Sequence, residues 1–152
     1  MAAATTKRAP GASATRSNVG FLLAKATQRW NELLIDAFAA AGYPEVRPSY
    51  GSLLIPLWEE DGLRMGELAA RARLSKQTIT TMARLLERDG LVIREPDPQD
   101  ARATRVRLTD RAKEFRAAAE EVLVDLYERL VERLSEKRTA ELQRTLVEVS
   151  EL

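Results

Sequence analysis

Five polar and basic residues within one short segment have side chains that could bind another molecule, and we call them the polar set. They carry amide, hydroxyl, ammonium and guanidinium groups: Lys76, Gln77, Thr80, Thr81 and Arg84. On a helix that begins after Ser75, a turn of about 100° per residue directs these side chains outward, with Thr81 at the border, while Ile79 and Leu86 face inward. Glutamine pairs with adenine through two hydrogen bonds, arginine or lysine pairs with guanine, and the threonine methyl contacts thymine. The set therefore favours contact with the edges of DNA bases.

Three further positions extend this chemistry. Ser75 can cap the helix, and the free amides at the helix start suit a phosphate group. Arg102 follows Asp100 in a turn, where an arginine can enter a narrow minor groove while a nearby carboxylate orients it. Arg105 lies on the outward side of the next predicted strand. The alternatives are a merely solvated helix face and a charged turn with a weak surface ion pair.

The composition excludes several other classes of site. The chain contains no cysteine and no histidine, which rules out disulfides, thiol redox sensing, Cys/His zinc sites and catalysis by imidazole or thiol. Its Asp and Glu residues fall at spacings typical of solvated helix faces and turns, so we predict no acid-base site. We therefore expect no enzyme, no metal and no cofactor.

The basic residues are concentrated in the middle of the chain. The 152 residues correspond to about one domain, and 24 basic against 23 acidic residues leave a net charge of only +1. Residues 64–113, however, hold twelve basic and seven acidic residues, a net charge of +5, while the remainder carries −4. A basic middle between acidic flanks is consistent with a phosphate-bearing partner for that segment.

The apolar periodicity predicts the elements that precede the polar set. A long amphipathic helix is capped by Ser17 or Asn18 and stops before Gly42, which can take the left-handed conformation that ends a helix. A second helix is capped by Ser49 and ends near residues 61–62. Pro56 lies inside it and lacks a backbone donor, so we expect a kink or an offset there.

The polar helix belongs to a helix-turn-helix followed by a hairpin. Residues 65–73 predict a short helix that a tight turn joins to the polar helix. Residues 91–95 and 104–108 alternate as paired strands do, and Arg102 lies in the turn between them.

The terminal helices carry more apolar positions than one small lobe requires. Thr109 can cap a fifth helix that reaches Ser135, and a sixth covers about residues 136–149. Their apolar stripes, with that of the first helix, predict a dimer interface. An intramolecular helical core is the alternative.

Four segments carry a family resemblance: 74–80 (LSKQTIT), 86–92 (LERDGLV), 97–100 (DPQD) after Arg94, and 106–109 (VRLT). Together they resemble the MarR family of dimeric winged helix-turn-helix transcription regulators. The resemblance implies a mainly α fold with a small β-hairpin wing. It implies one domain over residues 18–152, with a DNA-binding lobe at 49–109 and a helical dimerisation region formed by 18–42 and 109–152.

The resemblance also implies a function and a set of contacts. We expect a cytoplasmic homodimeric repressor that binds a pseudo-palindromic DNA operator, with half-sites about one helical turn apart. The resemblance implies that Arg102 contacts DNA at the wing tip and that the Asp100 carboxylate orients Arg102. The chain departs from the family pattern at Thr81 and Ala101, where a basic residue is common, and at Ala112, where glycine is common. A winged-helix module that binds protein and not DNA is the alternative function.

A family member would also hold a small-molecule effector, often an aromatic or phenolic anion, between the helical region and the DNA-binding lobe. The candidate residues are Arg29, Trp30, Phe38, Tyr50 and Trp58. Arg29 or Arg47 would meet a carboxylate, although aromatic residues at helical spacing line the core more often than a ligand site.

The amino-terminal residues 1–17 differ from the rest in composition. They are rich in Ala, Thr, Ser, Gly and Pro, and they hold Lys7, Arg8 and Arg16 without any acidic residue. We expect a disordered basic tail, with loose phosphate contact as a further possibility. No segment is long and apolar enough to predict a membrane span.

Overall fold

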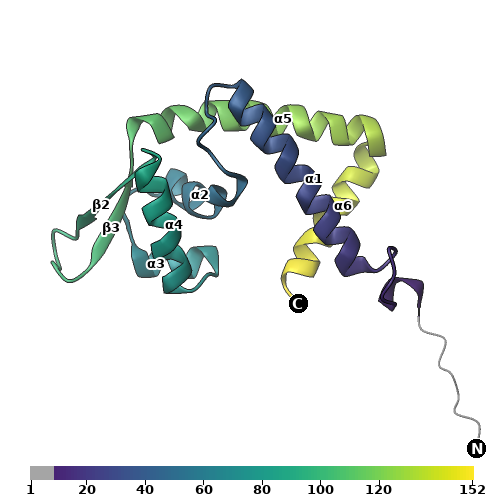
Figure 1. Ribbon diagram of the computed structural model, residues 1–152, viewed down its shortest axis with the longest axis horizontal. Coiled ribbons are helices and arrows are strands. Elements are labelled where there is room, and N and C mark those ends of the chain that lie inside the picture. Colours follow the sequence, from purple (N-terminus) through teal and green to yellow (C-terminus); the bar gives the residue numbers. More distant parts are fainter. Residues whose placement is uncertain (1–8) are drawn as a thin grey trace, which may run out of the picture.

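One long helix runs along the molecule from a small lobe with a β-hairpin to the opposite end, where the first and last helices of the chain lie (Figure 1). The computed structural model describes residues 9–152. Its elements in chain order are η1 (Pro10–Ala12), α1 (Val19–Ala40), η2 (Pro48–Tyr50), α2 (Gly51–Glu59), β1 (Leu63–Arg64), α3 (Met65–Ala72), α4 (Lys76–Arg88), β2 (Val92–Pro96), β3 (Thr104–Leu108), α5 (Asp110–Leu134) and α6 (Glu136–Ser150). The first eight residues of the expected tail lie outside the described part, and residues 10–12 form one 3₁₀ turn.

The first helix begins and ends as its sequence predicts. The Asn18 side chain accepts a hydrogen bond from the Phe21 amide at 3.2 Å, and this satisfies one of the free donors of the first turn. Gly42 has a φ of +93°, in the left-handed region that a glycine adopts without a steric penalty. The chain therefore turns sharply after α1 toward the lobe.

The start of the second helix differs from the prediction. Ser49 does not cap it: a 3₁₀ turn covers Pro48–Tyr50, and α2 follows from Gly51 with no side-chain cap. The proline at the first position of this turn fixes φ and favours an early turn before Ser49. Pro56 is buried, and α2 runs through it to Glu59.

The helix-turn-helix and the hairpin are confirmed. The hairpin strands pair antiparallel from Val92 opposite Leu108 to Pro96 opposite Thr104, one residue later on the first strand than predicted. The sequence did not reveal β1, whose two residues pair with β3 at Val106 and Arg105. A two-residue strand has no periodicity to recognise. The resulting sheet has the order β1-β3-β2.

The lobe is held together by one apolar core that reaches into α1 and α5. Its largest fully buried side chains include Tyr50, Leu53, Leu57, Leu68, Ile79, Leu86, Leu91, Val106 and Phe115. Burial of each large apolar side chain contributes roughly 1.5–3 kcal/mol. This is a mainly α winged helix-turn-helix with a three-stranded wing, and its core fixes the directions of α4 and the hairpin.

The terminal helices have the predicted lengths. Thr109 caps α5, and α5 passes into α6 at Ser135, whose φ is +81°. No helix in residues 9–152 is long and apolar enough to cross a membrane.

Candidate nucleic-acid interface

The outer face of α4 presents the predicted polar set. Ser75 caps the helix, with its Oγ accepting from the Thr78 amide at 3.1 Å. Lys76, Gln77, Thr81 and Arg84 are exposed, and Thr80 is half-buried. Lys76, Thr80 and Arg84 are four residues apart, so they follow one another along the same side of the helix.

The two threonine hydroxyls on this face are held within the helix. Thr80 Oγ1 donates to the Lys76 carbonyl at 2.8 Å, and Thr81 Oγ1 donates to the Gln77 carbonyl at 3.0 Å. A hydroxyl whose proton is used in this way keeps its acceptor lone pairs, and the methyl group adds an apolar contact. The Thr80 and Thr81 hydroxyl oxygens can therefore accept a hydrogen bond from a DNA base, and their methyl groups can contact a thymine methyl.

The hairpin tip presents one arginine. The side chain of Arg102 is 93% exposed. Its backbone amide and its Nε both donate to Asp100 Oδ1, at 3.1 and 3.3 Å. Asp100 thus lies where the sequence predicted a supporting carboxylate, and it touches the guanidinium through Nε.

A buried carboxylate at the start of the hairpin loop was not predicted. Asp97 accepts hydrogen bonds from Arg64 Nε at 2.5 Å, from Arg105 Nε at 3.0 Å and from the Gln99 amide at 2.8 Å. The Gln99 amide and the two guanidinium groups hold the pKa of Asp97 at about 2, against an ordinary 3.8. In the sequence, Asp97 lies between two prolines and indicates only a turn. Its partner Arg64 is 33 residues away, so no local pattern reveals the ion pair.

This ion pair changes the expected place of Arg105. Its outward direction on β3 predicted a DNA contact, but its side chain is only 33% exposed and is bonded to Asp97. Arg105 therefore shares the buried Asp97 carboxylate with Arg64 of the strand β1.

The acidic residues of α4 are turned toward the rest of the lobe. Glu87 accepts from Arg94 Nη2 at 2.7 Å and from Nε at 2.9 Å, and these bonds lower the pKa of the Glu87 carboxyl. Asp89, at the helix end, accepts from the Tyr50 hydroxyl at 2.5 Å and from Arg88. The outer face of α4 consequently carries no carboxylate to oppose a phosphate.

The ion pairs divide the twelve basic residues of segment 64–113 into two groups. Eight have a carboxylate partner: Arg64, Arg71, Arg88, Arg94, Arg102, Arg105, Arg107 and Arg111. Four make no ion pair within residues 9–152: Arg73, Lys76, Arg84 and Lys113. Three of these four lie on α4 or on the turn before it, so the free positive charge is concentrated at the helix-turn-helix.

The five candidate ligand residues are only partly brought together, since Phe38 and Trp58 both pack against Phe115. Phe38 and Tyr50 are buried in the core, and Phe38 packs edge-on against Phe115 with ring centroids 4.9 Å apart. Trp30 is half-buried against the same core. Arg29 is exposed and pairs with Glu32 at 3.1 Å.

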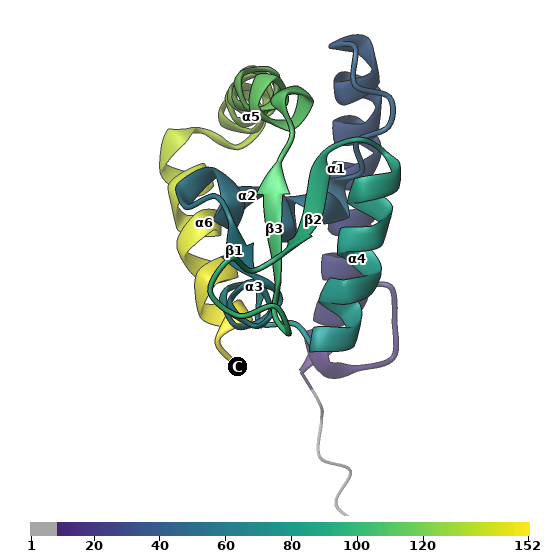
Figure 2. The ribbon, with the colours of Figure 1, turned by 90° about the vertical axis from the view of Figure 1, so that its left-hand side faces the viewer.

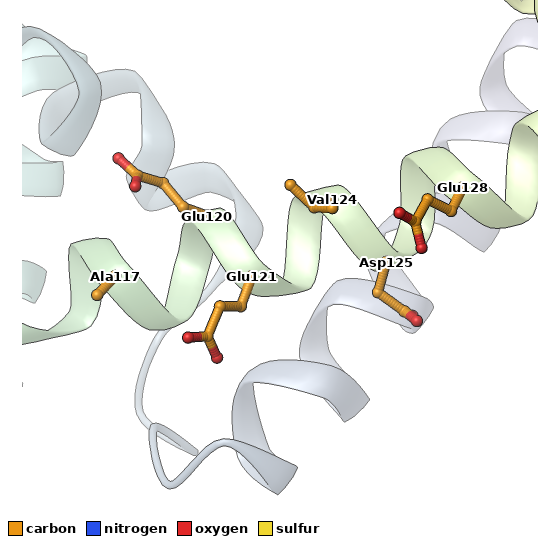
Figure 3. A pocket seen from close by; sticks show the side chains of 6 residues that line it. All are labelled: Ala117, Glu120, Glu121, Val124, Asp125 and Glu128. Carbon is orange, nitrogen blue, oxygen red and sulfur yellow. The ribbon is translucent and has the colours of Figure 1, made fainter.

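Trp58 is the candidate that lines a surface hollow. The hollow is formed by Leu57, Trp58, Asp61, Leu108, Lys113 and Arg116. The indole Nε1 donates to the Ala112 carbonyl at 3.2 Å, which fixes the ring. A second hollow on α5 is lined by four carboxylates and no cation (Figure 3), so its charge opposes an anionic ligand.

Comparison with known proteins identifies the lobe. The model of the MarR family matches residues 48–104, from η2 to the start of β3. Residues 48–104 of the chain therefore carry a MarR-type domain. Its relatives include the HTH-type transcriptional regulator TtmR of Methylorubrum extorquens (strain PA1), 39% identical over 66 residues, which are 43% of this chain and 33% of TtmR. The HTH-type transcriptional repressor IacR of Pseudomonas putida is 32% identical over 82 residues, which are 54% of this chain and 49% of IacR. The matches thus span a third to a half of these curated relatives.

Solved structures extend the likeness to nearly the whole chain. The transcriptional repressor CouR, bound to a 23-mer DNA duplex, has a TM-score of 0.74 at 25% identity, covering 87% of this chain and 92% of CouR. The PcaV regulator from Streptomyces coelicolor, in complex with its natural ligand, has a TM-score of 0.75 at 21% identity, covering 91% and 96%. The MarR fold therefore includes the terminal helices as well as the lobe.

Proposed function

We propose that this chain is a MarR-type, sequence-specific DNA-binding regulator of transcription, acting as a repressor. The observation that carries the proposal is the concentration of unpaired cations on the outer face of α4, on the same lobe as the exposed Arg102. TtmR and IacR are named as a transcriptional regulator and a transcriptional repressor, and CouR was solved on a DNA duplex. These relatives support the same activity for this chain, which would place it in the cytoplasm with its DNA.

The proposed contacts follow from the positions of the side chains. The helix α4 enters the major groove, where Lys76, Gln77 and Arg84 meet base edges and Thr80 and Thr81 offer acceptors or methyl groups. Ser75 and the first amides of α4 meet a phosphate. Arg102, oriented by Asp100, enters the minor groove.

We also propose that the chain acts as a homodimer. Large apolar side chains on the terminal helices remain exposed in the single chain: Val19, Phe21, Leu22, Leu123, Val124, Leu142, Leu146 and Val149. In Figure 1 α1, α6 and the second half of α5 lie at the end of the molecule opposite the hairpin. A partner bound there covers this apolar surface and leaves two lobes free for two half-sites.

A small aromatic or phenolic anion is the proposed effector that relieves repression. PcaV was solved with its natural ligand, which supports a ligand site in this chain too. The proposed site lies between the helical region and the lobe, where Trp58 lines a hollow that also holds Lys113 and Arg116. The buried Phe38 and Tyr50 would support that site from behind, and Trp30 and Arg29 approach it only if the dimer partner contributes them.

The experiment starts with selection of bound sequences from a random duplex pool, followed by fluorescence-anisotropy titration of the selected duplex. We expect Lys76→Ala and Arg102→Ala each to weaken binding by about tenfold, since a charge-assisted hydrogen bond contributes about 1.5–3 kcal/mol. Lys137→Ala is the matched control, because Lys137 is also exposed and makes no ion pair within residues 9–152 but lies on α6, away from the lobe. Unchanged affinity in both test variants contradicts the assigned contacts. Absence of any duplex binding at low salt favours the alternative protein-interaction module.

A further inference from the structure

The turn between α3 and α4 contains a non-glycine residue in a left-handed conformation. Arg73 has φ +52° and ψ +40°, and it ends α3 with its amide donating to the Ala70 carbonyl at 3.2 Å. Side chains with a Cβ adopt this region at a steric cost, which glycine avoids. The other positive-φ residues within 9–152 are Gly42, Gly62 and Gly90, together with Ser135 between α5 and α6. An arginine at residue 73 therefore keeps a strained backbone that glycine would relieve.

The Arg73 side chain does not compensate for this strain inside the protein. It is exposed, and it makes no ion pair or side-chain hydrogen bond with any of residues 9–152. Its neighbour Arg71, two residues earlier on α3, pairs with Glu60. The guanidinium of Arg73 is thus free at a position where the fold alone favours glycine. Strained residues of this kind are typical of functional sites.

The position of Arg73 relates it to the DNA-binding face. It lies three residues before Lys76, at the end of the lobe where α4 begins. In Figure 2 the start of α4, the helix α3 and the hairpin tip all lie toward the lower end of the lobe. Arg73, Lys76 and Arg84 are the free cations of the helix-turn-helix within the described residues.

We propose that Arg73 binds a phosphate of the DNA backbone and thereby positions α4 in the groove, an inference that rests on the proposed function. A residue in the turn lies outside the helix that enters the groove, so its guanidinium meets the phosphates at the groove edge and not the bases. Phosphate contacts fix register and orientation and carry no sequence information. The strain at residue 73 is retained because glycine would remove this contact.

The test compares Arg73→Gly with the wild-type protein in two measurements. Glycine relieves the left-handed strain, so the Tm of the protein without DNA should rise by about 2–4 °C. The same substitution removes a phosphate contact from each subunit, so affinity for the selected duplex at 0.1 M salt should fall about tenfold or more. The slope of log K against log salt should become shallower by about 1.8 per dimer. If Arg73→Gly is more stable than the wild type and binds DNA more weakly, unfolding cannot explain the loss of DNA affinity.

Two further variants separate charge from position. Arg71→Gln removes the same charge two residues away, where the cation is already paired with Glu60, and we expect its salt slope to stay close to that of the wild type. Arg73→Asn removes the guanidinium while tolerating the left-handed conformation, and it should reproduce the DNA-binding loss of Arg73→Gly. The loss should be equal on specific and unrelated duplexes, since the contact carries no sequence information.

The outcomes distinguish the two proposals. If the wild-type protein binds DNA with a steep salt dependence and Arg73→Gly keeps the same slope and affinity, the assignment of Arg73 is wrong while the regulator function stands. Equal losses for Arg71→Gln and Arg73→Gly also overturn it, because they indicate a general effect of net charge. If the wild-type protein binds no duplex at low salt, both proposals are wrong.

Discussion

Asp97 holds together the parts of the wing that its three hydrogen bonds reach. Its buried carboxylate bonds to Arg64 on β1, to Arg105 on β3 and to the Gln99 amide in the hairpin turn. One side chain thereby joins the strand that leads into α3 to both sides of the hairpin. Charged groups that leave water in this way are favourable only when their partners remain in place.

The depressed pKa of Asp97 predicts a specific loss of stability in acid. The carboxyl has a pKa of about 2 in the folded protein and an ordinary value of 3.8, so the unfolded chain takes up the proton first as the pH falls. The stabilisation from this group is complete above the unfolded pKa and is lost as the pH falls from about 4 to 2. Urea unfolding between pH 6 and pH 2 measures this loss. We expect Asp97→Asn to lower the free energy of unfolding at pH 6, and we expect the free energy of unfolding of the variant to change less between pH 4 and pH 2. An identical acid profile in the variant would contradict the ion-pair assignment. Asp36→Asn is a control, because Asp36 is exposed on α1.

At the scale of elements, Thr109 joins the wing to the helix α5. Its amide donates to the Leu91 carbonyl at 3.0 Å, and its Oγ1 donates to the Gly90 carbonyl at 2.7 Å. The same oxygen accepts from the Ala112 amide at 3.3 Å and caps α5. One side chain thus connects the end of β3, the turn after α4 and the first turn of α5.

Removal of this hydroxyl should destabilise the fold without affecting the DNA-contacting side chains. We expect Thr109→Ala to lower the free energy of unfolding by about 1–2 kcal/mol, from the lost cap and the unpaired Gly90 carbonyl. Thr109→Ser keeps both hydrogen bonds and should stay within about 0.5 kcal/mol of the wild type. Equal stability of the alanine variant and the wild type in urea would show that water replaces the cap.

The sequence predicted the elements better than the contacts between them. Local signals located α1, α4 and α5, because Asn18, Ser75 and Thr109 each cap a helix through an amide three residues later. The outer residues of α4 followed from helical geometry alone. Two features escaped prediction. The strand β1 is too short to show a period, and the ion pair between Arg64 and Asp97 joins residues that only the folded hairpin brings together. For the same reason the outward pattern of β3 did not reveal that Arg105 pairs with Asp97, and the contact of Arg105 with DNA stays a prediction.

The ligand prediction had a different weakness. Aromatic residues at helical spacing do not reveal whether they face a cavity or the core, and Phe38 and Tyr50 lie in the core. Only the position of Trp58 at a hollow agrees with the expected site, which stays a prediction.

At the scale of the whole molecule, the apolar stripe of α6 predicts how the chain associates. Leu142, Leu146 and Val149 lie on one side of this helix and are all exposed, Leu146 by 44%. We expect Leu146→Asp to convert the dimer to monomer in size-exclusion light scattering, because a charge would be buried in the apolar interface. Helicity should be unchanged, and DNA affinity should fall by at least tenfold, since one lobe then binds alone.

Arg144→Asp is the control for this variant, because Arg144 lies on the other side of α6. A dimer that survives Leu146→Asp would exclude this face from the interface.

The length of α5 has a mechanical consequence for any such dimer. The helix has 25 residues and begins two residues after β3, so it is a rod about 37 Å long with the wing attached at one end and the proposed interface at the other. A rotation of about 5° at the interface end displaces the wing end by about 3 Å, close to the rise of about 3.4 Å per base pair along the DNA axis. Small changes in how two chains meet are therefore magnified into a full step of register on the DNA.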